Sequence, residues 1–175
     1  MRGRRSLAGF VALAVVAFVT PSCSQSGVET NSAGEKLTAV TEDDQEMNSA
    51  IAQARSSLPQ FWAKFDARPA GYSDFQVKPG LASVDDYGTE FIWVDVVERR
   101  GDQVIGRLAN DPFHLGADMK LGSEVSFKPE LISDWGYSKG DVLYGHYTSR
   151  VLITRERDNP AEYGLSPTPL ETVQN

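Results

Sequence analysis

The chain has 175 residues, with 17 Lys and Arg against 24 Asp and Glu, which suits one domain with a net charge of −7. An excess of negative charge repels phosphate backbones and excludes a general role in nucleic-acid binding. One cysteine and two histidines exclude an internal disulfide and a zinc site built on cysteines or on several histidines. We therefore expect neither a metal nor a cofactor.

Residues 1–22 are predicted to be an export signal. Three arginines form a positive start, and an uncharged apolar run from Leu7 to Val19 follows. This run is shorter than the roughly 20 residues of a membrane-spanning helix. Removal of the segment leaves 14 Lys and Arg against 24 Asp and Glu, or −10. Cys23 directly follows, and its placement looks like a bacterial lipoprotein signal, so we predict lipidation at Cys23. The alternative is an ordinary cleaved signal and a soluble periplasmic or secreted protein.

A flexible tether and a helix come next. Residues 23–40 hold few large apolar side chains and are predicted to be the tether. A helix is predicted over residues 41–66, with Thr41 as its N-cap and acidic residues in its first turns. Pro59 predicts a kink, or a restart capped by Ser57. Apolar residues at steps of three and four form one stripe, namely Met47, Ile51, Ala54, Leu58, Phe61 and Phe65.

Antiparallel strands are predicted after the helix. A short strand fits residues 75–78, and the clearest strand covers residues 90–98, where β-branched and aromatic residues fill both faces. Gly101-Asp102 suits a tight hairpin into a partner strand over residues 103–109. A short alternating strand is predicted over residues 124–128.

The last part of the chain is predicted to hold a helical turn, one strand and a tail. The turn runs from Pro129 to Trp135, and the strand covers residues 142–155. Residues 156–175 contain three prolines and are predicted to be a disordered polar tail. The sequence thus predicts one α+β domain over residues 41–155, in which a kinked N-terminal helix packs on a curved antiparallel sheet of about five strands. A partly open barrel is the alternative form of this sheet.

Aromatic and polar side chains concentrate in residues 132–137 and 144–150. Aromatic faces with a few directed polar groups can form a groove for a peptide or glycan, and an arginine can contact an anion there. The candidate ligand-binding residues are Trp135, Tyr137, Tyr144, His146 and Arg150. The structural interpretation places Trp135 in the core, and has Asp134 accept backbone N–H groups or form a polar pair with Arg150.

A hydrolase is the alternative use of these residues. Asp134, His146 and either Ser133 or Ser149 supply the groups of a catalytic triad. The chain lacks a Gly-x-Ser-x-Gly elbow, and a regular strand would point Ser149 and His146 to opposite faces. We therefore name no catalytic residue.

A set of short motifs resembles a known family. The motifs are Met47-Asn-x-Ala-Ile-x-x-Ala-Arg55, Leu58-Pro-x-Phe61, Trp93-Val94, Asn110-Asp-Pro112, Gly122-x-x-Val-x-Phe127, Ile132-Ser-Asp-Trp135 and Tyr144-Gly-x-Tyr-Thr-x-Arg150. In order and spacing they resemble the YegJ-like bacterial domain, number 2314 among the domains of unknown function. The resemblance covers roughly Glu46 to Leu152. It implies a compact α+β domain, often exported, with no established activity, substrate or catalytic residue.

We therefore expect an exported protein of the bacterial cell envelope that acts as a non-enzymatic binding or accessory module. Its partner would be an unidentified protein, peptide or glycan, and Cys23 would attach it to the membrane. The alternative is a small envelope hydrolase that uses Asp134 and His146.

Overall fold

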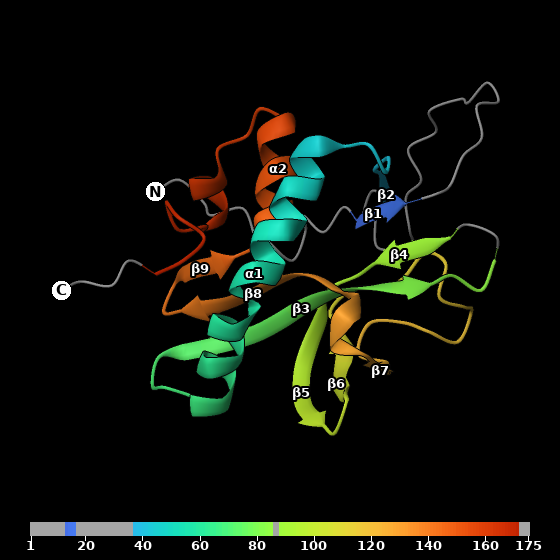
Figure 1. Ribbon diagram of the computed structural model, residues 1–175, viewed down its shortest axis with the longest axis horizontal. Helices are drawn as coiled ribbons and strands as arrows, with labels where there is room; N and C mark the ends of the chain where they lie inside the picture. The colour runs from blue at the N-terminus through green and yellow to red at the C-terminus, as the bar shows by residue number, and fades with distance from the viewer. Residues whose placement is uncertain (1–12, 17–36, 86–87, 172–175) are drawn as a thin grey trace.

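The computed structural model describes residues 13–16, 37–85 and 88–171 (Figure 1). This part of the chain contains nine strands, two α-helices and two short 3₁₀ turns. The strands are β1 Leu13–Val16, β2 Leu37–Ala39, β3 Tyr72–Ala82, β4 Thr89–Phe91, β5 Val94–Arg100, β6 Gln103–Leu108, β7 Glu124–Phe127, β8 Ile132–Lys139 and β9 Val142–Gly145. The helices are α1 Gln45–Ala67 and α2 Tyr147–Arg155, and the 3₁₀ turns are Pro129–Leu131 and Pro160–Tyr163.

The sheet is built around β3, its longest strand. β8 pairs antiparallel along one side of β3, while β4 and β5 pair with it in succession along the other side. β9 extends the sheet beyond β8, and β6 and β7 extend it beyond β5. The seven strands β3–β9 thus form an open antiparallel sheet with β7 and β9 at opposite edges. The predicted α+β class is confirmed, with two more strands than expected.

Two short strands lie beside β4, where β1 pairs antiparallel with β4 and parallel with β2. β1 falls in the predicted export signal, and β2 falls in the predicted tether. The rest of the signal, Cys23 and the tether up to residue 36 lie outside the described residues. Within the described ranges, no helix is long and apolar enough to cross a membrane.

Helix α1 forms where the apolar stripe predicts it. Its N-cap is Asp44 rather than Thr41, and the Asp44 carboxylate accepts a hydrogen bond from the Met47 N–H at 3.0 Å. The helix continues through Pro59, and Ser57 is not a cap, because its hydroxyl donates to the Gln53 carbonyl one turn earlier. The stripe faces the sheet and packs on β8, so the predicted helix-on-sheet arrangement is confirmed.

The predicted last strand over residues 142–155 is wrong beyond Gly145. His146 has a positive φ of 54° and turns the chain, and residues 147–155 form helix α2 beside α1 (Figure 1). The predicted helical turn likewise stops at Leu131, after which the chain forms β8. All residues of β8 except Lys139 are buried, so this strand has no polar face and shows no alternation.

Residues 156–171 pack against the domain instead of forming the expected disordered tail. Tyr163 and Leu165 are buried in a small apolar cluster with Ile153. Leu165 also forms a parallel bridge with Leu143 of β9, which the Ser166 N–H extends by donating to the Leu143 carbonyl at 2.9 Å. Two large apolar side chains thus give this polar stretch enough buried surface to hold it in place.

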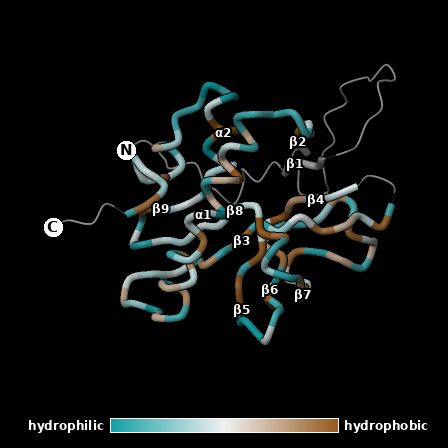
Figure 2. The backbone as a smooth tube through the Cα atoms, in the orientation of Figure 1, coloured by the Kyte–Doolittle hydropathy of each residue, from teal (hydrophilic) through white to brown (hydrophobic). Residues whose placement is uncertain are grey.

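The core lies between α1 and the sheet. Figure 2 shows apolar residues along the middle of the strands and hydrophilic residues at turns such as the one between β5 and β6. Five aromatic residues fill the space under α1, with neighbouring ring centroids 5.7–6.2 Å apart: Phe61, Phe65, Phe75, Trp135 and Tyr137. Each such side chain contributes about 1.5–3 kcal/mol when fully buried, so this cluster is the main attachment of the helix to the sheet.

Candidate functional site

A pocket of about 280 Å³ opens between the N-terminal half of α1, the sheet and the start of α2. Its lining combines an apolar part with a polar part. The apolar residues are Val40, Met47, Ile51 and Phe91, and the polar residues are Thr41, Glu42, Asn48, Arg55, Lys78, Ser133 and Thr148. A concave site with apolar walls and a few directed polar groups is the usual form of a small-molecule site.

Lys78 is the unusual residue in this lining, because its side chain is buried with only 2% of its surface exposed. It comes from β3, and its Nζ donates a long hydrogen bond of 3.4 Å to Thr148 Oγ1. The same Nζ lies 5.5 Å from the centre of the Trp93 ring. Burial lowers the pKa of Lys78 from 10.5 to about 8, and the charge of Asp134 opposes this shift. At pH 7 the pocket therefore contains a buried ammonium group with little hydrogen bonding.

Asp134 of β8 lies behind the pocket and holds the first turn of α2. Its carboxylate accepts hydrogen bonds from the N–H groups of Tyr147 at 3.0 Å and Thr148 at 2.8 Å. It also accepts from Thr148 Oγ1 at 2.6 Å and from the Trp135 N–H at 2.8 Å. Burial raises the pKa of Asp134, while the hydrogen bonds from Thr148 and the charge of Lys78 oppose the rise. Because all four contacts present a hydrogen to the oxygens, Asp134 acts as the cap that the helix lacks at His146.

Arg55 supplies a second positive charge at the pocket. It projects from α1, and its Nε donates to the Ile132 carbonyl at 3.0 Å, which fixes the direction of the guanidinium. Its two terminal nitrogens have no hydrogen-bond partner among the described residues. Lys78 and Arg55 thus approach the pocket from the sheet and from the helix. This arrangement suits an anionic ligand, although Glu42 also lies in the lining.

The predicted aromatic groove is filled. Trp135 has no exposed surface, and its indole N–H donates to the Ala54 carbonyl at 2.9 Å, as the core interpretation expects. Tyr137 is 4% exposed and stacks between Trp135 and Tyr144 at centroid distances of 5.7 and 5.6 Å. Residues 166–171 lie beside these three aromatic rings, because the Gly145 N–H donates to the Pro169 carbonyl and Leu170 packs on the core. None of these three residues lines the pocket.

His146 and Arg150 also have structural positions. His146 is 3% exposed, and its ring lies 4.7 Å from the Trp93 ring at a tilt of 49°. Among the described residues, its Nδ1 has no hydrogen-bond partner. Burial lowers its pKa from 6.5 to about 3, with smaller effects from Arg150 and Lys78, so the imidazole is neutral. Arg150 donates to the carbonyls of Gly145 at 2.9 Å and Ser166 at 2.8 Å. The predicted pair of Asp134 and Arg150 is replaced by separate sets of hydrogen bonds.

This geometry argues against the hydrolase alternative. Asp134 is saturated by four donors rather than oriented toward His146, and both side chains are buried away from the pocket. Ser133 donates to the Lys78 carbonyl at 2.7 Å, so its hydroxyl is not held by a base. In the ranges that the structure describes, no three metal-binding side chains come together.

Sequence reasoning missed Lys78 and Arg55. A lysine before Pro79-Gly80 in a short strand has the local pattern of an exposed strand end. In the structure Lys78 lies inside β3, where Trp93 and Thr148 of α2 lie beside its Nζ. Strand alternation would place Phe75 and Val77 on one face and Lys78 on the other, so no local signal indicated its burial.

Comparisons with known proteins identify the family but no activity. Residues 44–162 match the family model described as "Uncharacterized protein conserved in bacteria (DUF2314)". The chain is 34% identical over 122 residues to "Uncharacterized protein YegJ" of Escherichia coli (strain K12), covering 69% of this chain and 76% of that protein. No solved structure matches significantly. The match contains the pocket lining from Met47 onward, and the chain belongs to this YegJ-like family of uncharacterised bacterial proteins.

Proposed function

We propose that this protein is an exported, non-enzymatic accessory module of the bacterial cell envelope whose pocket binds a small organic anion. One observation carries the proposal: the buried Lys78 lines the pocket, and its ammonium group makes a single hydrogen bond of 3.4 Å within the part of the chain that the structure describes. A buried charge is costly unless it is paired and hydrogen-bonded. Asp134 favours the charged form of Lys78, but its oxygens bind Trp135, Tyr147 and Thr148, so a carboxylate or phosphate oxygen in the pocket would supply a direct partner.

The lining also supports a ligand of limited size with a mixed character. A volume of about 280 Å³ is at the small end for ligand sites. Arg55 can bind a second oxygen of the anionic group, because planar guanidinium nitrogens suit carboxylate and phosphate. Met47, Ile51 and Phe91 would contact an apolar body. The proposed ligand is a carboxylate or phosphate ester with a short apolar chain.

Export and lipid attachment are the second part of the proposal, and the sequence of residues 1–23 supports them. Cleavage before Cys23 would remove β1, and β4 would lose that neighbour. Mass spectrometry of the mature protein from bacterial membranes tests this part. We expect an N-terminus at acylated Cys23, and an unmodified N-terminus elsewhere would rule out the anchor.

Ligand binding is tested with a panel of short-chain carboxylates and alkyl phosphates. Thermal shift screens the panel, and calorimetry measures the affinity of each compound that binds. We expect at least one compound to bind the wild type, and binding at least tenfold weaker in Lys78→Met, which keeps the side-chain length and removes the charge. Arg55→Gln should weaken the same compound several-fold. Lys128→Met removes an exposed lysine and is the matched control. If no compound binds, or if Lys78→Met folds and binds equally well, the pocket is not an anion site.

The pKa of Lys78 gives the same site a pH dependence. Since the pKa lies at about 8, Lys78 is mostly charged at pH 7 and mostly neutral at pH 9. An anion that needs the ammonium should therefore bind about tenfold more weakly at pH 9 than at pH 7. The Lys78→Met variant should show no such change over this range.

A further inference from the structure

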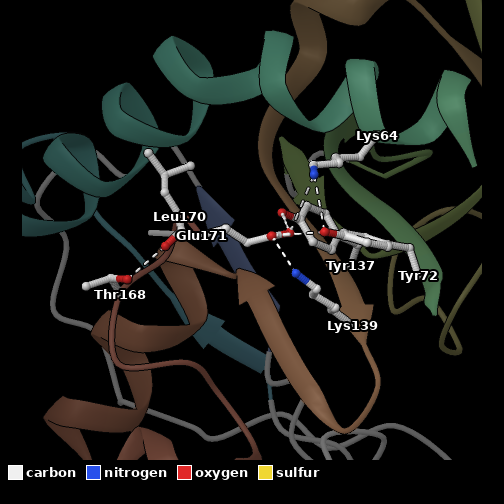
Figure 3. Close-up of polar contacts among 7 residues, drawn as sticks. All are labelled: Lys64, Tyr72, Tyr137, Lys139, Thr168, Leu170 and Glu171. Carbon is white, nitrogen blue, oxygen red and sulfur yellow. Dashed lines mark hydrogen bonds and ion pairs between the residues drawn. The ribbon is translucent and has the colours of Figure 1, made fainter. Parts of the chain in front are cut away.

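A second polar cluster, which shares no residue with the pocket, surrounds Glu171 (Figure 3). The Glu171 carboxylate accepts hydrogen bonds from the hydroxyls of Tyr72 and Tyr137 and from Lys139 Nζ, each at 2.9 Å. Lys64 Nζ lies 3.9 Å from Oε1. Burial alone would raise the pKa of Glu171, but Lys139 and the two tyrosines hold it below its usual value. Three hydrogen-bond donors and a second ammonium group from the domain thus converge on one carboxylate.

The receiving groups are ordered by contacts among themselves. Lys64 of α1 donates to the Tyr72 hydroxyl at 3.2 Å and lies 4.7 Å from the centre of its ring. Tyr72 of β3 and Lys139 of β8 are partners in the sheet, and the Tyr72 and Tyr137 rings lie 5.6 Å apart. The site is therefore built by α1, β3 and β8, and Glu171 completes it. Without a carboxylate, two ammonium groups and two hydroxyls would face one another.

The chain around Glu171 is bound as a peptide. The Pro169 carbonyl accepts a hydrogen bond from the Gly145 N–H at 2.8 Å at the end of β9. Leu170 packs on the apolar core, and Thr168 Oγ1 donates to the Leu170 carbonyl at 2.8 Å. The site thus recognises a backbone carbonyl, an apolar side chain and a carboxylate in three successive residues, which is how peptide grooves combine affinity with specificity.

Two facts indicate that this occupant can be exchanged. The family match covers residues 44–162, so it includes all four receiving residues and excludes Pro169, Leu170 and Glu171. Lys64 and Lys139 are 37% and 47% exposed, and ion pairs at such positions contribute little to holding a segment closed. The ion pairs of Glu171 thus add little to the packing and hydrogen bonds that hold the segment, and the site keeps its donors when residues 169–171 leave it.

We propose that the cluster of Lys64, Tyr72, Tyr137 and Lys139 is a binding site for an acidic peptide with the pattern Leu-Glu. The chain's own residues 169–171 occupy this site, and a segment of a partner protein displaces them. Residues 169–171 are then an internal competitor. This site shares no residue with the pocket around Lys78. Its test is therefore independent of the proposed anion binding.

The experiment measures fluorescence anisotropy with a labelled peptide Ser-Pro-Thr-Pro-Leu-Glu, amidated so that its single carboxylate is the glutamate side chain. The titrated proteins are the full-length wild type and Glu171→Gln, which keeps the shape of the side chain and removes its charge. We expect the variant to bind the peptide at least tenfold more tightly, because its own segment no longer competes with a carboxylate. Glu162→Gln removes an exposed carboxylate from the preceding 3₁₀ turn and should bind like the wild type.

Two further measurements establish that the peptide uses this cluster. Adding Lys139→Gln to Glu171→Gln should abolish the gain, and a peptide with Gln in place of Glu should bind at least tenfold more weakly. Equal binding by wild type and Glu171→Gln, or by the two peptides, would overturn the proposal. Sedimentation of the wild type tests whether two copies of the chain exchange residues 169–171. A dimer that is absent in Glu171→Gln would identify the partner as a second copy of this chain and would overturn the proposal of a separate partner protein.

Discussion

Asp134 is the residue on which the arrangement of α2 depends, and Asp134→Asn tests this directly. The substitution keeps the size of the side chain but replaces one carboxylate oxygen by an NH₂ group. In the least unfavourable orientation this group takes the place of Oδ2, which accepts from the Thr148 N–H and from Thr148 Oγ1. The hydroxyl can rotate and accept instead, whereas the Thr148 N–H is left without a partner in a fully buried position.

The expected cost follows from these contacts. An orphaned buried N–H costs about 1–3 kcal/mol, and the two bonds that stay on Oδ1 lose their charge assistance, about 0.5–1 kcal/mol each. Removal of a buried charge returns part of this loss. We therefore expect Asp134→Asn to lower the free energy of unfolding by about 3 kcal/mol, a large part of the usual 5–15 kcal/mol.

Urea unfolding at pH 7, followed by tryptophan fluorescence, measures this change. With an m-value of about 1–3 kcal/mol per molar, the midpoint should fall by about 1–3 M urea. Asp95→Asn is the matched control, because Asp95 is exposed on β5 and accepts one hydrogen bond from Gln76 at 2.7 Å. Its effect should stay near 0.5 kcal/mol. A loss below about 1 kcal/mol for Asp134→Asn, or an equal loss for Asp95→Asn, would refute the capping role.

Two predictions concern the packing of His146. Because its folded pKa of about 3 lies below the unfolded 6.5, the unfolded chain binds the proton first, and stability is lost as pH falls from 6.5 toward 3. Asparagine tolerates the positive φ of this position, so His146→Asn tests the effect. Between pH 7 and pH 5, the free energy of unfolding measured with urea should fall by about 2 kcal/mol less in this variant than in the wild type. An equal fall in both proteins would contradict the prediction. Gly136→Ala would place a Cβ 2.2 Å from His146 Nε2, so we expect a cost of about 1–3 kcal/mol that His146→Asn partly relieves, and additive effects in the double-mutant cycle would contradict the contact.

The elements that sequence predicted well are those whose pattern is local. The stripe of α1 has helical spacing over its whole length, and the β5–β6 hairpin carries Gly101-Asp102 at its turn. Both signals are independent of the rest of the chain. The clearest predicted strand was divided at Ile92 and Trp93 into β4 and β5, because these strands pair with different parts of β3.

The elements that sequence missed depend on distant partners. Helix α2 contains several β-branched residues and lacks a side-chain cap at His146, so its local pattern favours a strand. Asp134, thirteen residues earlier in the chain, supplies the cap through two backbone hydrogen bonds. β8 was missed for the related reason that helices and strands bury both of its faces. In each case tertiary contacts override local preference.

The hydrogen bonds of Asp134 to α2 also explain why the candidate site contains Lys78 and not the aromatic side chains of residues 132–137 and 144–150. Asp134 uses both oxygens to hold α2, and Thr148 Oγ1 donates to it, so the one hydroxyl that Lys78 contacts is already engaged. The Asp134 carboxylate is therefore directed toward the helix, and Lys78 lines the pocket with one long hydrogen bond to Thr148. A residue that looked catalytic thus has a structural role, and that role leaves Lys78 with the single long hydrogen bond on which the proposed anion binding rests.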